Sequence, residues 1–544
     1  MQSIIQRSEA QTSEEMVKQS KPFGKIRNFV WPIHNFELKK LVPMFVLFFL
    51  ISFVYNILRN LKIALFVGGD SSFAELMPFL KIGAVLPGAL LFTYIFTVLI
   101  SRFTRDQVFY TIISGFMVYF ALFLFVLYPH NDALQLNTVA DFLQTNVFPG
   151  AGFKGIIAAI RYLNLTVFYV MSEMWSVIVL TVLFWGFANE VTKLDEAKRF
   201  YAIFALGGNA SGILSGSFGK IEGISLIPVF SFYKNNEWIF LQLCTVLTIG
   251  LVVMYLFYLL NKKVLHAENT KFSASVLKKS QSLSLRECFA HLKKSRYLAY
   301  MVVIVVCYNI VYNLADSMLM YKIQQVHETS REVNAYMSSI TLITGLVAVV
   351  LALLVSGNTI RRFGWTIAAL ITPIVWFLTS MGFLSGLVLE KTVLFDVLST
   401  FISNPANLVL FMGSLQMCLG RGCKYTVFDE AKEIAFIPLP KDSKRKGKAV
   451  VDGLASRFGK SGGAVICIML YAVLGGIENS IPYVAALTFI VLVFWLYVTY
   501  KMGKIVDRAM SSGITLTLEE EHALSRKPSG KVVEATQTTA VPQT

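Results

Sequence analysis

The chain has 544 residues, of which 55% are hydrophobic and only 15% are charged, and its formal net charge is +16. Soluble domains carry about 25% charged residues, so this composition is typical of a membrane protein and argues against a soluble domain. The six cysteines form no CxxC pair and the six histidines form no ligand-spaced group, so we predict no disulfide framework, no metal site and no cofactor.

Apolar runs long enough to cross about 30 Å of hydrocarbon follow a polar N-terminus and interfacial segment, residues 1–40. The predicted spans are 41–67, 73–101, 107–128, 156–190, 196–219 and 237–261, then 297–325, 332–355, 364–388, 400–434, 449–475 and 480–503. They predict an N-terminal six-helix half (41–262), a basic linker (263–296), a C-terminal six-helix half (297–503) and a polar, disordered tail (504–544).

Loop charge predicts the orientation, because cytoplasmic loops of membrane proteins collect Lys and Arg. With a cytoplasmic N-terminus, the basic loops all fall on the cytoplasmic side: 102–105, 193–199, the linker, 361–362 and 441–448. The loops on the other side carry few cations. We therefore expect both termini in the cytoplasm.

The two halves also resemble each other. Val54–Asn56 and Val311–Asn313 both read VYN in the first span of each half, and GGNASG at 207–212 corresponds to GKSGG at 459–463. Duplicated halves of the same topology, joined by a long linker, describe the major facilitator architecture. We therefore predict an all-α membrane protein of about 12 transmembrane helices in two pseudo-symmetric halves, with the substrate between them near the midplane.

Several charges lie inside these spans, where a Lys or Arg costs about 2.5–3.5 kcal/mol on insertion scales. Charges kept at such depth face a bundle interior or a watery cavity and indicate a functional site. The candidates are Arg59, Lys62, Lys81, Glu173, Asp316 and Lys460. Converging cations suit a polyphosphate, and a buried carboxylate can pair with a cation or carry a proton.

The sequence alone does not pair these charges. We considered Lys81, Arg59 and Lys460 as partners of the two carboxylates. Arg59 and Lys62 can also be read as anchors at the end of the first span. Asp452 and Arg457 lie nearer the cytoplasmic end, where they would gate the cavity or pair with each other.

Gly459-Lys460-Ser461 looks like the end of a phosphate-binding loop, GxxxxGK[ST]. The preceding glycine, Gly453, stands one position too early, and no strand precedes it, so we reject ATP hydrolysis at this motif. The small residues are better explained by close helix packing and by access to Lys460.

Residues 422–440 read GCKYTVFDEAKEIAFIPLP, and the motif continues as KGKAVVDGLASRFGKSGGA. This stretch resembles the signature of the nucleotide transporter family, the ATP/ADP translocases of plastids and obligate intracellular bacteria. The resemblance extends over 21–504 and implies movement of nucleotides across a membrane, either as exchange of ATP for ADP plus phosphate or as import with protons. It also implies that Lys81, Glu173, Asp316 and Lys460 are essential charges and that Asn209 is a further substrate contact.

Two departures from the family pattern bear on whether transport is an exchange or is driven by protons. Residues 58–63 read LRNLKI where exchanging members usually read LRDTKD, and Asp316 and Met320 stand where the family has Glu and Lys. These changes favour a broad nucleotide importer, proton-coupled through Glu173 or Asp316. A strict ATP/ADP exchanger is the alternative.

A facilitator of another anion, such as a sugar phosphate, is a further alternative. A membrane enzyme acting on a phosphate-bearing substrate is an alternative of another class, but no acid–base or nucleophile set supports catalysis, so we predict that the chain is not an enzyme. The expected partners are nucleotides, a proton or phosphate co-substrate and the lipid bilayer, with no nucleic acid. We expect a monomer in the inner membrane of a bacterium.

Overall fold

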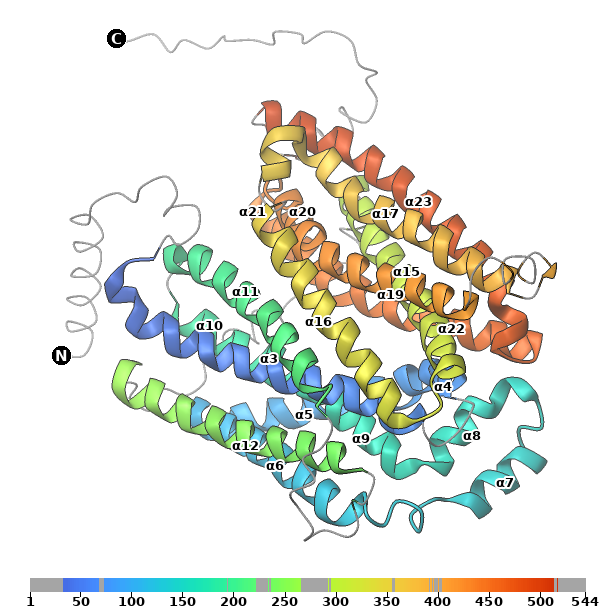
Figure 1. Ribbon diagram of the computed structural model, residues 1–544. Coiled ribbons are helices and arrows are strands. Elements are labelled where there is room, and N and C mark those ends of the chain that lie inside the picture. The colour runs from blue at the N-terminus through green and yellow to red at the C-terminus, as the bar shows by residue number, and fades with distance from the viewer. Residues whose placement is uncertain are drawn as a thin grey trace, which may run out of the picture.

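The computed structural model describes residues 33–67, 73–192, 194–221, 236–265, 295–354, 358–390 and 404–512, with a few isolated positions between them. Within these residues the chain is helical and contains no strand. The helices form two groups, one coloured blue to green and one yellow-green to red (Figure 1). The all-α membrane fold predicted from the sequence is confirmed.

The first group contains the segments that correspond to the first six predicted spans. They are α3 (Leu38–Val67); α4 (Phe73–Phe79), η2 (Leu80–Val85) and α5 (Leu86–Arg102); α6 (Arg105–Leu122) and η3 (Phe123–Leu127); α9 (Leu163–Met174), η5 (Trp175–Phe184) and α10 (Trp185–Val191); α11 (Leu194–Phe218); and α12 (Glu237–Leu259) with η7 (Leu260–Leu265).

The second group contains the remaining six. They are α15 (Arg296–Val326); α16 (Ser330–Leu354); α17 (Asn358–Leu389); α19 (Pro405–Cys423), η8 (Lys424–Phe428) and α20 (Asp429–Ala435); α21 (Lys441–Lys448), η9 (Ala449–Ala455) and α22 (Ser456–Leu474); and α23 (Ile477–Ser512). Most of the predicted linker and the tail lie outside the described residues.

Among the described residues, ten helical segments are long and apolar enough to cross a membrane. The predicted spans 196–219 and 400–434 are helical too, as α11 and as α19 to α20, but they are not among those ten. Charged and small residues explain the difference, because α11 begins LDEAKR and contains GGNASG, and α19 ends GRGC.

The predicted boundaries of the fourth span were wrong. Residues 154–161 form a separate helix, α8 (Lys154–Arg161), because the backbone leaves the helical region at Tyr162, with φ −98° and ψ 47°. The long helix therefore begins at Leu163. A further helix, α7 (Asn137–Asn146), lies in the segment predicted as a loop. Arg161 and Asn164 flank Tyr162, but the apolar residues on both sides of them favoured one continuous span.

Aromatic side chains fill the core of the first group. Trp175 is fully buried, and its indole N–H donates to the carbonyl of Ile51 at 3.1 Å, which joins η5 to α3. Phe123 and Phe168 stack with ring centroids 4.1 Å apart. These large, well-anchored groups bury much apolar surface, so they fix the helices that carry the deep charges.

The two groups meet along α11 and α16, which lie side by side in Figure 1. Small residues allow this approach: a Cβ on Gly216 would clash with Ser338 and Leu342, and one on Gly345 would clash with Asn209. Close contact of membrane helices through small side chains is a common packing mode.

The bundle has two ends, which we call the Leu38 end and the Val67 end after the two ends of α3. At the Val67 end hydrogen bonds join the two groups: Asn334 donates to the carbonyl of Gly219, and the amide of Ile477 donates to Glu75. At the Leu38 end the described ion pairs stay within one group, as in Lys40–Glu196 and Lys448–Glu433. The groups are therefore tied together at the Val67 end.

Two glycines of α22 should respond oppositely to alanine. A Cβ on Gly459 would lie 2.7 Å from that of Asn309 on α15, whereas a Cβ on Gly462 would meet nothing within 4 Å. Gly459→Ala should lower stability by about 1–3 kcal/mol through overpacking. Gly462→Ala should raise it by about 0.4–1 kcal/mol, because alanine restricts the unfolded chain.

The measurement is the midpoint of thermal unfolding of the two purified variants in one detergent. Equal midpoints would contradict the described packing of α22 on α15.

Candidate functional site

Lys81 connects the two groups of helices. It lies in η2, a π-helical segment between Pro78 and Pro87, and prolines interrupt the regular hydrogen-bond ladder of a helix. Short π-helical segments within α-helices often mark functional sites. The Lys81 amine donates to Asn313 Oδ1 at 2.8 Å and to Asp316 Oδ2 at 3.1 Å, both on α15.

Asp316 also faces Arg421 of α19, which the sequence reasoning missed. Arg421 Nη2 lies 3.9 Å from Asp316 Oδ1 and donates to the hydroxyl of Tyr312 at 2.5 Å. Its Nη1 is buried and makes no described hydrogen bond. Arg421 stands within the apolar run MCLGRGC, so the same rule for charges at depth could have found it.

Lys62 and Glu173 form a second ion pair, between α3 and α9. The Lys62 amine also lies 4.3 Å from the ring centroid of Tyr169. Lys62 is only 3% exposed, whereas Glu173 is 29% exposed. The expected set of partners for the carboxylates was therefore incomplete: Lys81 does pair with Asp316, but Glu173 pairs with Lys62, which the sequence reasoning had not considered.

Arg59 and Lys62 do not share one partner. Three residues of helix turn the chain by about 300°, so neighbouring side chains on one face can still diverge. Lys62 reaches Glu173, while Arg59 is half-buried, makes no described ion pair, and lies close enough to Asp316 and Tyr55 to interact with them electrostatically.

Lys460 of α22 is exposed to solvent, yet it lies close enough to Lys81 and Lys424 to repel them electrostatically. No carboxylate among the described residues pairs with its amine. Lys424, in η8, pairs with Asp429 at 3.1 Å. A solvent-accessible Lys beside other cations is stabilised by water or by an anion.

Asn209 lies apart from these pairs in the described contacts. It is half-buried on α11, and its backbone carbonyl lies against Gly345 of α16. Its side chain makes no described hydrogen bond to the charged residues. The structure therefore places it at the interface of the two groups without joining it to the charges.

Asp452 does not pair with Arg457. Its carboxylate accepts from Lys432 at 2.7 Å, which ties η9 to α20 near the Leu38 end. Lys432 follows Asp429 by three residues and lies 3.9 Å from it. The alternative that Asp452 and Arg457 pair with each other was wrong, because tertiary packing places Lys432 beside Asp452.

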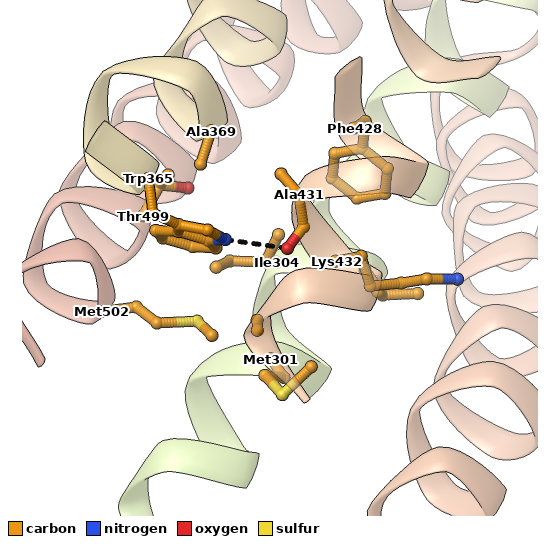
Figure 2. A pocket seen from close by; sticks show the side chains of 11 residues that line it. Met301, Ile304, Trp365, Ala369, Phe428, Ala431, Lys432, Thr499 and Met502 are labelled. Carbon is orange, nitrogen blue, oxygen red and sulfur yellow. Dashed lines mark hydrogen bonds between the residues drawn. The ribbon is translucent and has the colours of Figure 1, made fainter. Parts of the chain in front are cut away.

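A small apolar pocket lies elsewhere, between α15, α17, α20 and α23. Figure 2 shows Met301, Ile304, Trp365, Phe428 and Met502 around it, with the Trp365 indole donating to the carbonyl of Ala431 at 2.8 Å. The Lys432 amine points away from the pocket in this view. With no cation directed into it, this pocket does not suit a phosphate group.

The charged residues that pair with or lie near Lys81, Lys62, Arg59 and Lys460 are unbalanced. They comprise six cations and three carboxylates, an excess of three positive charges: Arg59, Lys62, Lys81, Arg421, Lys424 and Lys460 against Glu173, Asp316 and Asp429. Among the described residues no group of three or more His, Cys, Asp or Glu could hold a metal ion. A region of this charge attracts a polyanion and holds it by charge-assisted hydrogen bonds.

Comparison with known proteins decides the family. A family model described as TLC ATP/ADP transporter matches residues 16–505. The chain belongs to this family. It is 36% identical over 520 residues to ADP,ATP carrier protein 2 of Chlamydia pneumoniae, with 93% of this chain and 96% of that protein covered.

Further relatives come from other organisms. ADP,ATP carrier protein 1 of Rickettsia bellii is 32% identical, with 88% of this chain and 96% of that protein covered. The chloroplastic ADP,ATP carrier protein 1 of Arabidopsis thaliana is 34% identical, covering 84% of this chain and 72% of that protein.

Solved transporter structures share the fold. A bacterial homologue of the iron transporter ferroportin in an inward-facing state has a TM-score of 0.53 at 10% identity, covering 87% of this chain and all (100%) of that one. The D-xylose–proton symporter has a TM-score of 0.50 at 13% identity, covering 84% and 97%. The TLC family chain is therefore a multi-pass membrane transporter with a major-facilitator-like fold.

The Lys62–Glu173 pair should show an asymmetric response to mutation. Glu173→Gln leaves the buried Lys62 without its charge partner and should lower the free energy of unfolding by about 3–5 kcal/mol. Lys62→Met should lower it by less, because Glu173 keeps contact with solvent. The double variant should recover most of the loss, since both charges are gone.

Thermal unfolding of the four proteins measures these effects. Arg161→Met, which breaks an exposed pair with Asp141, is the control and should change stability by less than about 1 kcal/mol. Additive losses in the double variant would rule out the pairing.

Proposed function

We propose that this TLC family transporter imports nucleoside triphosphates such as ATP, GTP, CTP and UTP by alternating access. The observation that carries the proposal is the excess of deep cations, above all Arg59 and Lys460, which make no described ion pair. A triphosphate supplies the missing negative charge. The bacterial relatives named ADP,ATP carriers support a nucleotide as the substrate.

In this proposal Lys81, Arg59 and Lys460 bind the phosphate groups, and Asn209 makes a further contact. Lys62 holds Glu173 beside them and belongs to the same substrate-binding set. When phosphate takes the amine of Lys81, Asp316 loses its partner at 3.1 Å. Asp316 then turns to Arg421, at 3.9 Å, or accepts a proton.

This competition couples substrate to conformation. Lys81 and Asp316 lie in different groups of helices, so their ion pair holds the groups together when no substrate is bound. A bound polyphosphate replaces that tie with its own contacts to both groups. The groups can then separate at the Val67 end and close at the Leu38 end, which is the movement that alternating access requires.

Two versions of the function differ in what drives nucleotide transport. We favour proton-coupled net import with Asp316 or Glu173 as the proton carrier, because Asn60 and Ile63 replace acids of the exchanging pattern. Exchange of ATP for ADP, with or without phosphate, is the second candidate, since the relatives' names favour it. We also propose an inner-membrane monomer with cytoplasmic termini and no enzymatic step.

Uptake by proteoliposomes containing the purified full-length protein tests the function. Labelled ATP, GTP, CTP and UTP should all enter unchanged, and a proton uncoupler should abolish accumulation. Lys460→Ala should reduce uptake at least about 100-fold, as expected when a charged hydrogen bond to a phosphate is lost. Lys501→Ala, at an exposed lysine of α23, is the matched control and should retain uptake.

Uptake that requires internal ADP and ignores the uncoupler would overturn proton-coupled import in favour of exchange. Competition by sugar phosphates but not by nucleotides would overturn the substrate assignment.

A cysteine pair should trap one state of the cycle. A Cβ on Gly219 would lie 2.9 Å from that of Ser338, which is shorter than the 3.5–4.5 Å between the Cβ atoms of a disulfide, so the two segments need only move apart slightly for the bond to form. Gly219→Cys with Ser338→Cys should therefore cross-link α11 to α16 and hold the Val67 end closed. Uptake should fall to the background level and return with a reductant.

The two single-cysteine variants control for direct effects of either substitution. Full uptake by the cross-linked protein would show that the Val67 end need not open.

A further inference from the structure

Tyr425 is a large aromatic residue exposed near the middle of its membrane segment. Its side chain is 47% exposed, although it lies in η8 between α19 and α20. The Lys424 amine lies over its ring, and Arg59 and Lys460 are close enough to interact with its phenol electrostatically. This exposed ring is therefore directed toward the charged interior.

Cations from both groups of helices surround the ring. The Lys424 amine lies 4.4 Å from the ring centroid of Tyr425, and Arg59 and Lys460 lie close enough to interact electrostatically with its phenol. The Tyr425 hydroxyl makes no described hydrogen bond. The Lys424 amine covers one face of the ring, so the opposite face is the one available to a ligand held by these cations.

Other tyrosines near the charges are less suitable as a platform. Tyr308 and Tyr169 are buried, 7% and 2% exposed, and Tyr312 uses its hydroxyl to hold Arg421. Tyr497 is 57% exposed and has Lys501 5.5 Å from its ring, but it lies on α23 with no described contact to the charged residues. Tyr425 combines exposure with a place beside the cations.

We propose that Tyr425 is the platform on which the nucleobase stacks while Lys81, Arg59 and Lys460 hold the phosphates. This inference rests on the proposed nucleotide substrate and assigns its base subsite. Stacking on an aromatic ring tolerates every base, because each base presents a π face. A site of this kind, without hydrogen bonds to base edges, accepts purine and pyrimidine nucleotides alike.

Equilibrium binding to the purified full-length protein in nanodiscs tests the assignment. Labelled ATP is competed by unlabelled ATP, GTP, CTP, UTP and inorganic tripolyphosphate, which has the charge but no base. Tyr425→Leu should weaken all four nucleotides by roughly 5- to 150-fold, the range that one lost stacking contact spans. Its affinity for tripolyphosphate, followed by direct calorimetry, should not change.

Two variants serve as matched controls. Tyr425→Phe keeps the ring and should bind every ligand as the wild type does. Tyr497→Leu removes a more exposed ring that also lies beside a lysine, and it should leave all affinities unchanged. An unchanged tripolyphosphate affinity also shows that Tyr425→Leu has folded.

Three outcomes would overturn the assignment: nucleotide affinities that survive in Tyr425→Leu, equal losses for nucleotides and tripolyphosphate, or a loss in Tyr425→Phe as large as in Tyr425→Leu. A wild-type protein that binds no nucleotide would overturn the proposed function itself. A wild-type protein that binds nucleotides no tighter than tripolyphosphate would overturn only the base platform.

Discussion

The ion pair between Lys81 and Asp316 is the interaction on which the rest of the arrangement depends. It joins η2 of one group of helices to α15 of the other at 3.1 Å, and Asn313 and Arg421 hold its two ends. A charge pair away from bulk water is costly to break by removing one partner. A ligand that offers Lys81 another anion can replace the pair without leaving Lys81 unpaired. Binding of the ligand is thereby coupled to movement of the two groups of helices.

The local backbone supports this exchange of partners. Lys81 and Lys424 lie in π-helical segments, and Glu173 stands two residues before another. Such segments are wider than an α-helix and have fewer regular hydrogen bonds, so side chains are directed differently and the helix can shift more easily. Trp175 begins one of these segments, but its buried indole and its hydrogen bond to the carbonyl of Ile51 anchor that segment in a densely packed aromatic core.

Charge and aromatic surface together define the kind of ligand that fits. The cations without described carboxylate partners favour binding of a ligand with several phosphate groups. The exposed ring of Tyr425 lies beside them, where a flat apolar group of the same ligand can stack on it. The apolar pocket near Trp365 has neither property, so volume alone does not locate the site. A nucleotide combines both kinds of surface in one molecule.

The sequence by itself determined the helical membrane class, most of the long helices and most of the deep charges, because apolar length and charge are local properties of the chain. It missed Arg421, although the rule for charges at depth applies to this residue, and it missed the break at Tyr162, because non-helical backbone at one residue has no fixed sequence pattern. Only the tertiary structure decided that Lys62 pairs with Glu173 and Asp452 with Lys432. Those pairings depend on how distant helices rotate and pack against each other, which no short stretch of sequence specifies.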